Sequence, residues 1–251
     1  MRILVIGESC KDRFVYCDTD RLSPEAPVPV LVPKRTVEAG GMATNVVNNI
    51  LAMDPSIEVK WVIPIHEMVK TRYVDDKSNH MFFRVDEPLG DSTPMTRFNL
   101  TQEVESLITS ADAVIVSDYN KGFLTREDLL DIASLSKFSV LDTKKILDHS
   151  VISEFNFIKL NEKEFKANSQ FLLSYKFIVT LGASGAMYMD KIYPSPSPKE
   201  TIDVSGAGDT FIAAFTINYL KSDVANKVEE SIGYANKMCS IVVSKRGIST
   251  P

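Results

Sequence analysis

Eight residues near the carboxyl-terminal end of the chain, 203–210, combine the residue types needed for chemistry on a phosphate group. They read Asp-Val-Ser-Gly-Ala-Gly-Asp-Thr, and an apolar run begins directly after them. Small residues let backbone N–H groups approach a ligand. A helix that starts there leaves its first N–H donors unpaired and points its dipole at an anion. We therefore expect Gly206, Ala207, Gly208 and Asp209 to form a phosphate cradle.

Asp209 is placed where the first turn of that helix would hold it beside the cradle. A carboxylate there would accept the proton of an attacking hydroxyl while the amides hold the developing phosphate charge, so the octet predicts phosphoryl transfer to an alcohol. We expect the helix N-terminus to depress the pKa of Asp209, which makes it a weak base. The alternative is an ordinary glycine loop in which Asp209 only favours the helix start.

Composition and charge exclude several classes of ligand. The 251 residues can bury one large core, and the net charge of −5 gives no electrostatic footprint for nucleic acid. No apolar run is long enough to span a bilayer, and no signal-peptide pattern opens the chain. Three cysteines without metal-ligand spacing indicate reduced thiols. We therefore expect a cytoplasmic protein that acts on small molecules, with no nucleic-acid or membrane partner.

Alternating strand and helix patterns must position these residues. Apolar runs and helical spacing predict strands at 3–6, 59–63, 113–116, 139–141, 157–160, 177–181 and 186–189, with helices at 43–53, 102–109, 125–135, 208–220 and 224–244. This alternation predicts a three-layer α/β fold with a mostly parallel central sheet. Ligands of such folds bind outside the carboxyl ends of the strands.

Two extended, proline-containing segments interrupt the alternation, at about 13–36 and 70–86. We expect strands at 28–32 and 81–85, because proline is tolerated at sheet edges. We interpret both segments as a small β lid over the site, within a single domain that spans 1–251.

Known nucleotide loops narrow the choice of chemistry. The chain has no Gly-x-Gly-x-x-Gly after its first strand and no Gly-x-x-x-x-Gly-Lys-Ser/Thr anywhere. A dinucleotide-dependent oxidoreductase and a P-loop NTPase are therefore disfavoured.

Two further motifs offer ligand contacts. Gly40 and Gly41, before a predicted helix, would let a sugar approach the backbone while the Asn45 amide bonds its hydroxyls; the alternative is a simple turn. Asn161 and Glu164 follow a predicted strand and present oxygen atoms of the kind that Mg²⁺ prefers; the alternative is an acidic helix start.

Taken in order along the chain, these motifs resemble those of the ribokinase-like (PfkB) carbohydrate kinases. The octet is similar to their C-terminal signature, the pair at 40–41 to their N-terminal glycine signature, and 180–185 to their nucleotide loop. The resemblance implies a ribokinase-like fold, ATP and Mg²⁺ as cofactors with a monovalent cation as a further candidate, and a homodimer paired through the lid. It implies a catalytic base at Asp209.

The resemblance also implies roles for other positions. It places the sugar at Asp12, Gly40, Gly41 and Asn45. It places the nucleotide at Asn161, Glu164, Thr180, Gly182, Gly185, Asn236 and Gly247, with Asn161 and Glu164 organising Mg²⁺, partly through water.

Within the family, the segments 21–30, 70–74 and 117–122 resemble the heptose-phosphate kinases of lipopolysaccharide-precursor synthesis. This implies ATP-dependent phosphorylation of the anomeric hydroxyl of D-glycero-D-manno-heptose 7-phosphate, with Arg72, Asp118 and Lys121 binding the substrate. Cations of the two lid segments (Arg21, Lys70, Arg72 and Arg84) and Lys121 are expected to meet its phosphate. The alternatives are a kinase of another sugar and a non-catalytic sugar- or nucleotide-binding relative.

The chain departs from the family pattern in three places. It is markedly shorter between 65 and 70 and between 166 and 175, so we expect peripheral helices to be lost and apolar surface to be exposed. It stops at Pro251, so we expect the nucleotidyltransferase half of the bifunctional members to be absent.

Overall fold

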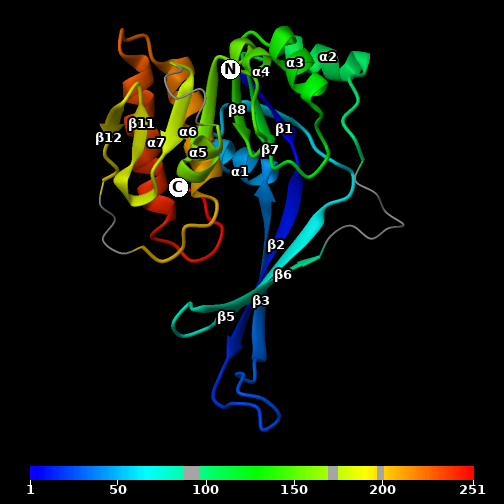
Figure 1. Cartoon of the computed structure of the whole chain (residues 1–251), viewed down its shortest axis with the longest axis vertical. Coiled ribbons are helices and arrows are strands. Elements are labelled where there is room, and N and C mark those ends of the chain that lie inside the picture. The colour runs from blue at the N-terminus through cyan, green and yellow to red at the C-terminus, as the bar shows by residue number, and fades with distance from the viewer. Residues whose placement is uncertain (88–95, 169–174, 197–200) are drawn as a thin grey trace.

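The computed structural model describes residues 1–87, 96–168, 175–196 and 201–251 and places them in a body and a projecting sheet (Figure 1). In the body, the described residues form an eight-stranded sheet in the order β12-β11-β10-β9-β8-β7-β1-β4. The parallel strands are β1 (Arg2–Gly7), β4 (Glu58–Val62), β7 (Ala113–Asp118), β8 (Ser139–Thr143), β9 (Phe157–Asn161) and β10 (Phe177–Thr180). Two antiparallel strands follow at one edge, β11 (Ala186–Tyr188) and β12 (Lys191–Tyr193).

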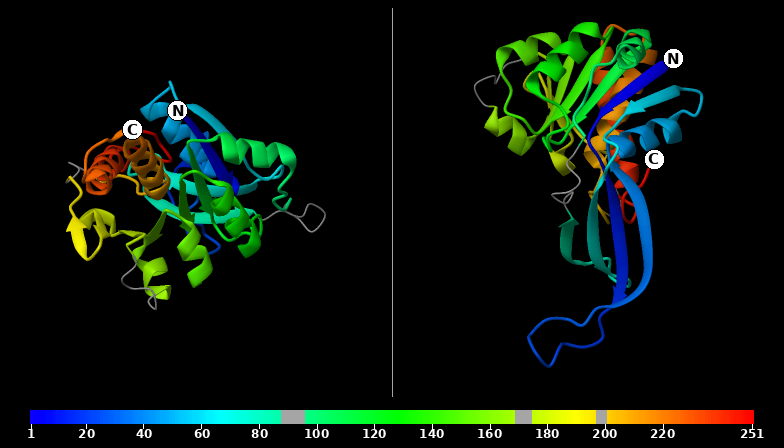
Figure 2. Two further views of the ribbon diagram at one scale, coloured as in Figure 1. Left: turned by 90° about the horizontal axis from the view of Figure 1, so that it is seen from above. Right: turned by 90° about the vertical axis from the view of Figure 1, so that its right-hand side faces the viewer.

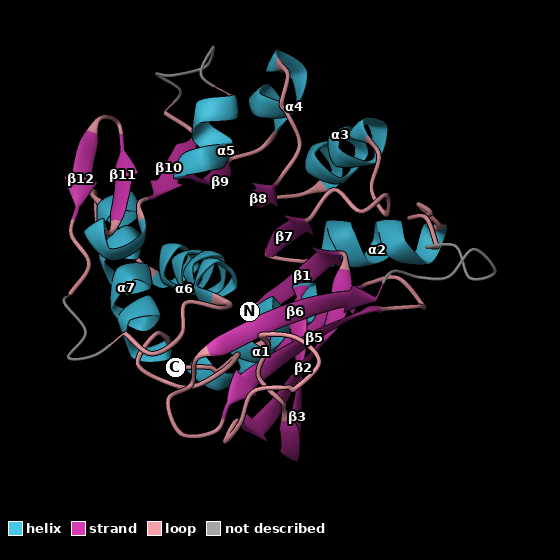
Figure 3. Ribbon diagram, turned by 60° about the horizontal axis from the view of Figure 1, so that its bottom comes forward, coloured by secondary structure: helices cyan, strands magenta, loops and turns pink. Residues whose placement is uncertain are grey.

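Helices cover both faces of this sheet, because its buried strands carry apolar residues on both sides. In β1, Ile3 and Val5 pack into one core, while Leu4 and Ile6 pack into the other. The first core contains α1 (Ala43–Met53), α6 (Ala207–Lys221) and α7 (Lys227–Val242). On the other face lie α2 (Gln102–Ser110), α3 (Arg126–Leu135), α4 (His149–Glu154) and α5 (Glu162–Ala167) (Figure 3). The predicted three-layer α/β fold with a mostly parallel sheet is confirmed.

Side-chain caps fix where several helices begin. At the start of α3, the Thr125 hydroxyl accepts the Asp128 N–H while the Asp128 carboxylate accepts the Thr125 N–H, which is a capping box. Thr101 caps α2 by accepting the N–H of Val104. Each cap satisfies N–H groups that have no partner inside the helix. The starts of α2 and α3 therefore follow from local sequence.

The lid is a second sheet of four strands in the order β3-β2-β5-β6 that projects from the body (Figures 1 and 2). Its strands are β2 (Ser9–Asp18), β3 (Val32–Met42), β5 (Met68–Asp75) and β6 (Met81–Glu87). The predicted strand at 28–32 was wrong: this stretch makes only an isolated bridge between Leu22 and Pro29, and β3 begins at Val32. Prolines without an N–H cannot continue a ladder there.

One face of the lid points toward the body. The register pairs Phe14 with Arg72 and Tyr16 with Val74, so these side chains share a face. The body segment near the C-terminus contacts that face, because Ile248 packs against Phe14, Tyr16 and Val74. We call it the inner face of the lid; by the same register it also carries Asp12 and Lys70.

Apolar side chains are exposed near both shortened stretches. Trp61 and Ile65 are 53% and 79% exposed, and Tyr175 is 63% exposed. These values agree with the expectation of uncovered apolar surface, although residues 169–174 of the second stretch lie outside the described part of the chain. Among the described helices, none is both long and apolar enough to cross a membrane.

Candidate active site

The helix α6 begins where the octet predicted it. Gly206 caps the helix in the left-handed conformation with φ of 79°, and Asp209 lies in the first turn, only 3% exposed. A Cβ atom at Gly206 would lie 2.5 Å from Nδ2 of Asn45, so both the backbone conformation and the close approach favour glycine. The Ala207 N–H donates to the Val204 carbonyl. The amides of Gly208 and Asp209 are therefore the first-turn donors left for a ligand.

The carboxylate of Asp209 is held by two donors. Nδ2 of Asn45 donates to Oδ2 at 2.9 Å, and the Tyr119 hydroxyl donates to Oδ1 at 2.8 Å. Burial nevertheless raises the pKa of Asp209 to about 6, because removing the charge from water outweighs these two hydrogen bonds. The predicted depressed pKa was therefore wrong, because desolvation of the buried carboxylate dominates. The group is better suited to accept a proton near neutral pH than an ordinary aspartate.

A polar network between α1 and α6 orients Asn45. The Asn49 amide donates to the carbonyl of Asn45 at 2.8 Å and to its Oδ1 at 3.1 Å, and the Thr210 hydroxyl donates to Oδ1 of Asn49 at 2.8 Å. Because Oδ1 of Asn45 accepts, its NH₂ group must point at Asp209. Asn45 was predicted to contact sugar hydroxyls; in the structure its amide positions the carboxylate.

The loop after β7 is organised by a buried acid that sequence reasoning missed. Glu8, fully buried, accepts the backbone N–H groups of Tyr119, Lys121 and Phe123 at 2.7, 2.8 and 3.2 Å. These bonds place the Tyr119 ring beside Asp209. A glutamate directly after a buried strand was the available signal for Glu8, whereas no spacing rule marks the tyrosine.

Two predicted sugar residues on this loop differ in their surroundings. The Asp118 carboxylate accepts bonds from the Thr143 hydroxyl and from Nζ of Lys145, both at 2.6 Å, so it is engaged within the protein. The Lys121 side chain is exposed. Asp118 therefore holds the ends of β7 and β8 together, while Lys121 is accessible to a ligand.

The predicted sugar residues of the lid come together at its inner face. Arg72 forms an ion pair with the buried Asp12, and its guanidinium lies 5.0 Å from the centre of the Phe14 ring. A Cβ at Gly41 would lie 1.9 Å from Oδ2 of Asp12, so only glycine allows this approach. A Cβ at Gly40 would meet the Thr44 side chain at 2.3 Å. The glycine pair thus lets the end of β3 pass close to the carboxylate.

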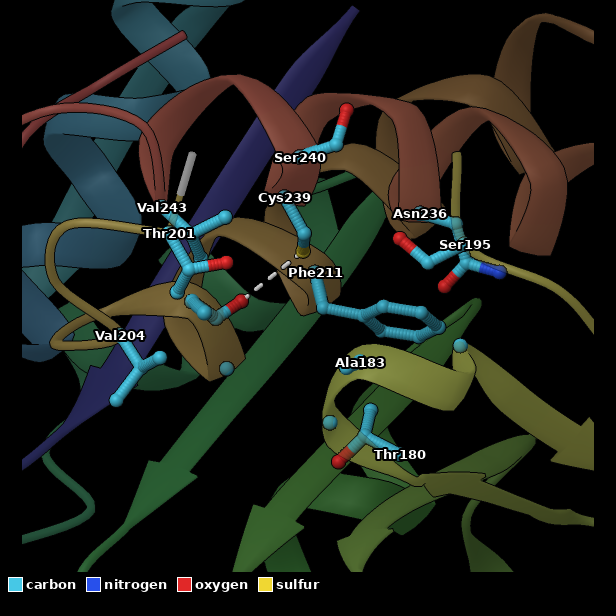
Figure 4. A pocket seen from close by; sticks show the side chains of 14 residues that line it. Thr180, Ala183, Ser195, Thr201, Val204, Phe211, Asn236, Cys239, Ser240 and Val243 are labelled. Atoms are coloured by element: carbon cyan, nitrogen blue, oxygen red, sulfur yellow. Dashed lines mark hydrogen bonds between the residues drawn. The ribbon is translucent and has the colours of Figure 1, made fainter. Parts of the chain in front are cut away.

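An apolar pocket beside α6 gathers most of the predicted nucleotide residues (Figure 4). Thr180, Gly182, Gly185 and Asn236 line it together with Gly208 from the octet. Phe211, Val204 and Val243 supply apolar walls. The amide of Asn236 donates to the carbonyl of Tyr193 at 2.8 Å. The pocket is therefore an apolar hollow that opens next to the first turn of α6.

Gly247 does not join that pocket. A Cβ there would lie 3.7 Å from ring atoms of Phe14 and from the hydroxyl of Tyr16, at the base of the lid. The structure therefore separates Gly247 from the other predicted nucleotide residues.

Asn161 and Glu164 form a reciprocal capping box at the start of α5. The Asn161 side chain accepts the Glu164 N–H at 2.8 Å, and Oε2 of Glu164 accepts the Asn161 N–H at 2.7 Å. Burial raises the pKa of Glu164. A second hollow next to them is lined by Asn161, Thr180 and Gly182. The described residues contain no group of three His, Cys, Asp or Glu side chains that could hold a metal ion. The amide and carboxylate oxygens of this pair are nevertheless of the kind that Mg²⁺ prefers.

A buried ion pair lies behind the octet. Nζ of Lys159 bonds Oδ2 of Asp142 at 2.8 Å, and a Cβ at Gly208 would come within 2.8 Å of that ammonium. Burial opposes the charge of Lys159, but Asp142 and other nearby carboxylates outweigh it, so the pKa of Lys159 is raised. The first turn of α6 therefore faces a permanently charged lysine.

Comparison with known proteins identifies relatives over nearly the whole chain. Bifunctional protein HldE of Helicobacter pylori is 31% identical over 98% of this chain and 63% of its own length, so the chain spans less than two thirds of that relative. The alignment needs 296 positions, which agrees with the expectation that this chain is the shorter of the two over the shared region.

Solved structures share the fold. Phosphofructokinase-2 from Escherichia coli in complex with potassium superposes with a TM-score of 0.70 at 15% identity, covering 99% of this chain and 94% of the other. A ribokinase from Arabidopsis thaliana complexed with ribose and ATP gives 0.66 at 13% identity, covering 98% and 93%. Residues 89–251 match the family model described as pfkB family carbohydrate kinase. The chain therefore belongs to the pfkB family of carbohydrate kinases.

Proposed function

We propose that this carbohydrate kinase transfers the γ-phosphoryl group of ATP to the anomeric hydroxyl of D-glycero-D-manno-heptose 7-phosphate. The observation that carries the proposal is the buried Asp209 carboxylate with its raised pKa. Gly208, the residue before Asp209, lines the apolar pocket. Tyr119, which donates a hydrogen bond to Asp209, lies under Lys70 of the lid. A base in this position serves a hydroxyl held between lid and nucleotide.

In the proposed reaction, Asp209 accepts the proton of the anomeric hydroxyl as its oxygen attacks the γ-phosphorus of ATP. The bond from that phosphorus to the bridging oxygen breaks, and ADP leaves with the bonding electron pair. The N–H groups of Gly208 and Asp209 are the donors for the developing charge. A loose transition state asks the protein mainly for such positioning.

The two hollows support ATP and Mg²⁺ as the cofactors. The apolar pocket with Phe211 suits adenine, and the capping-box residues Asn161 and Glu164 would hold hydrated Mg²⁺. When bound, Mg²⁺ neutralises phosphate charge. The potassium complex of the Escherichia coli relative supports a monovalent cation as a further candidate. All three cysteines are unpaired, which supports a cytoplasmic location where thiols stay reduced.

The choice of sugar rests on the HldE relative and on cations near the lid. A phosphate buried without a cationic partner would be costly to desolvate, and arginine bonds phosphate with two parallel donors. Arg72 on the inner face and the exposed Lys121 are the proposed contacts of the 7-phosphate. Arg72 would share its guanidinium between Asp12 and the ligand.

We also infer a homodimer through the lid. Met81, Phe83 and Val85 of the edge strand β6 are 41–50% exposed, and Tyr73 stacks on Phe83 with ring centres 4.8 Å apart. An exposed apolar edge strand is normally paired or covered. A second copy of the chain would cover it symmetrically.

Replacing Asp209 by asparagine tests the kinase assignment. Asn keeps the size and the helix start but cannot accept the proton, so we expect kcat to fall by about 10²–10⁴-fold. ADP affinity should stay unchanged, and exposed Asp131→Asn on α3 is the matched control. A variant that keeps more than a tenth of the wild-type kcat would contradict the role of Asp209.

Removing the Tyr119 hydroxyl should move the pH profile. Wild-type kcat should rise with pH up to about 6 and level off above it, because Asp209 acts only when ionised. The hydroxyl bonds the charged form, so Tyr119→Phe should raise the pKa of Asp209 further and shift this limb to higher pH. Exposed Tyr175→Phe should leave the profile unchanged. An unmoved limb in Tyr119→Phe would argue against the contact.

The substrate assignment predicts discrimination by the 7-phosphate. We expect kcat/KM for heptose 7-phosphate to exceed that for the dephosphorylated heptose by about 100-fold or more. Lys121→Ala should raise KM for the sugar phosphate by about tenfold and leave KM for ATP unchanged, with exposed Lys137→Ala as control. Equal kcat/KM values for the two sugars would contradict the proposed substrate but not the proposed kinase activity.

The lid dimer is tested by mass in solution. Light scattering should give twice the chain mass at micromolar concentration, and Phe83→Lys should give a monomer because it charges the β6 surface. Ile192→Lys, on the exposed surface of β12 in the body, is the control that should stay dimeric. A monomer mass for the wild type would exclude the dimer.

A further inference from the structure

Two lysine ammonium groups lie over one aromatic ring beside the base. Nζ of Lys144 is 4.2 Å and Nζ of Lys70 is 5.5 Å from the centre of the Tyr119 ring. Lys144 directly follows β8 at the carboxyl edge of the body sheet, whereas Lys70 lies on the inner face of the lid. The hydroxyl of this Tyr119 ring donates to Asp209. Body and lid therefore each bring one cation to the base.

Neither lysine forms an ion pair with any carboxylate of the described residues. Three other cations around the site do, and these pairs are Arg72 with Asp12, Lys145 with Asp118, and Lys159 with Asp142. Lys121, farther along the loop after β7, is exposed. Among the described residues, the positive charges over the Tyr119 ring that lack an ion pair are therefore those of Lys70 and Lys144. Contact with an aromatic face alone holds such a cation only weakly.

The two charges also oppose each other. Burial lowers the pKa of Lys144; the carboxylates of Glu164 and Asp142 oppose this shift, and the positive charges of Lys70 and Lys159 add to it. Two like charges gathered over a ring are favourable only if an anion neutralises them. Lys144 is nonetheless exposed and Lys70 half-buried, so a ligand can reach both.

The neighbours of Lys144 indicate which anion this is. Glu164, Asp142 and Lys159 act on its charge, and they belong to the nucleotide side of the site, next to the capping box and Gly208. Lys70 approaches from the lid, where the sugar would be bound. A group that meets both lysines therefore lies between nucleotide and sugar.

We propose that Lys70 and Lys144 together bind the phosphoryl group while it passes from the nucleotide to the sugar hydroxyl. Lys144 would contact it from the nucleotide side and Lys70 from the lid. The proposal rests on the proposed kinase function and names two further residues that touch the reacting group. Their charge offsets the negative charge of the phosphoryl oxygens next to Asp209. Because Lys70 belongs to the lid, the site is complete only when the lid is in place.

The test uses ADP, Mg²⁺ and aluminium fluoride, which together imitate the phosphoryl group in transfer. For the wild type we expect fluoride to tighten ADP binding at least about tenfold in calorimetry, as transition-state analogues bind more tightly than ground-state ligands. Lys144→Met and Lys70→Met should each lose this gain and keep the affinity for ADP alone. Lys137→Met, an exposed lysine before β8, should behave as the wild type.

Steady-state kinetics provides a second readout. Each variant should lower kcat by about 100-fold, the cost of losing one electrostatic contact to the reacting group, with KM for the sugar unchanged. Lys144→Arg keeps the charge, so aluminium fluoride should again tighten ADP binding in this variant, although less than in the wild type. Recovery would exclude a merely structural role.

Three results would overturn the proposal. The first is a wild type whose ADP affinity does not respond to fluoride, and the second is a pair of methionine variants that keep the full response. The third is a raised KM for the sugar phosphate at unchanged kcat, because the lysines would then bind the substrate's own phosphate. Failure of the wild type to phosphorylate any sugar would instead contradict the proposed function, and the fluoride measurement would still decide the role of the lysines.

Discussion

The burial of one carboxylate governs the architecture of the site. Asp209 is 3% exposed, and a charge removed from water is costly unless donors surround it. Two donors supply hydrogen bonds to this carboxylate: the Asn45 amide from α1 and the Tyr119 hydroxyl from the loop after β7. Each donor needs its own support: Asn49 orients Asn45, and Glu8 fixes the loop that carries Tyr119. Elements far apart in sequence therefore all help to position the Asp209 carboxylate. Its pKa stays high enough for it to act as a base.

Charge pairing divides the surroundings of that carboxylate into satisfied and available groups. Ion pairs at the strand ends and on the lid engage Arg72, Lys145 and Lys159 with neighbouring aspartates. Breaking such a buried pair would leave an uncompensated charge. These pairs therefore act as fixed structure. Next to the carboxylate, the donors available to a ligand among the described residues are the first-turn amides of α6 and the two lysines over the Tyr119 ring.

The sequence predicted the parts whose causes are local. The helical spacing at 43–53 and the octet before α6 gave correct elements, because periodicity and small residues act within a few positions. The strand at 28–32 failed because pairing is decided by the partner strand and not by extended residues alone. The roles of Glu8 and Tyr119 depend on long-range contacts. Glu8 and Tyr119 are separated by 111 positions in the sequence, and Tyr119 and Asp209 by 90 positions. The pKa of Asp209 was misjudged because burial depth is a tertiary quantity.

The central claim is that the Asp209 carboxylate is buried, held by two donors and poised near neutral pH. A carbon-detected NMR titration of aspartate side chains, assigned by comparison with Asp209→Asn, measures this directly. We expect one carboxyl resonance, absent from the variant, to titrate at about 6. A titration of Asp209 near the ordinary aspartate value of about 3.9 would contradict the account.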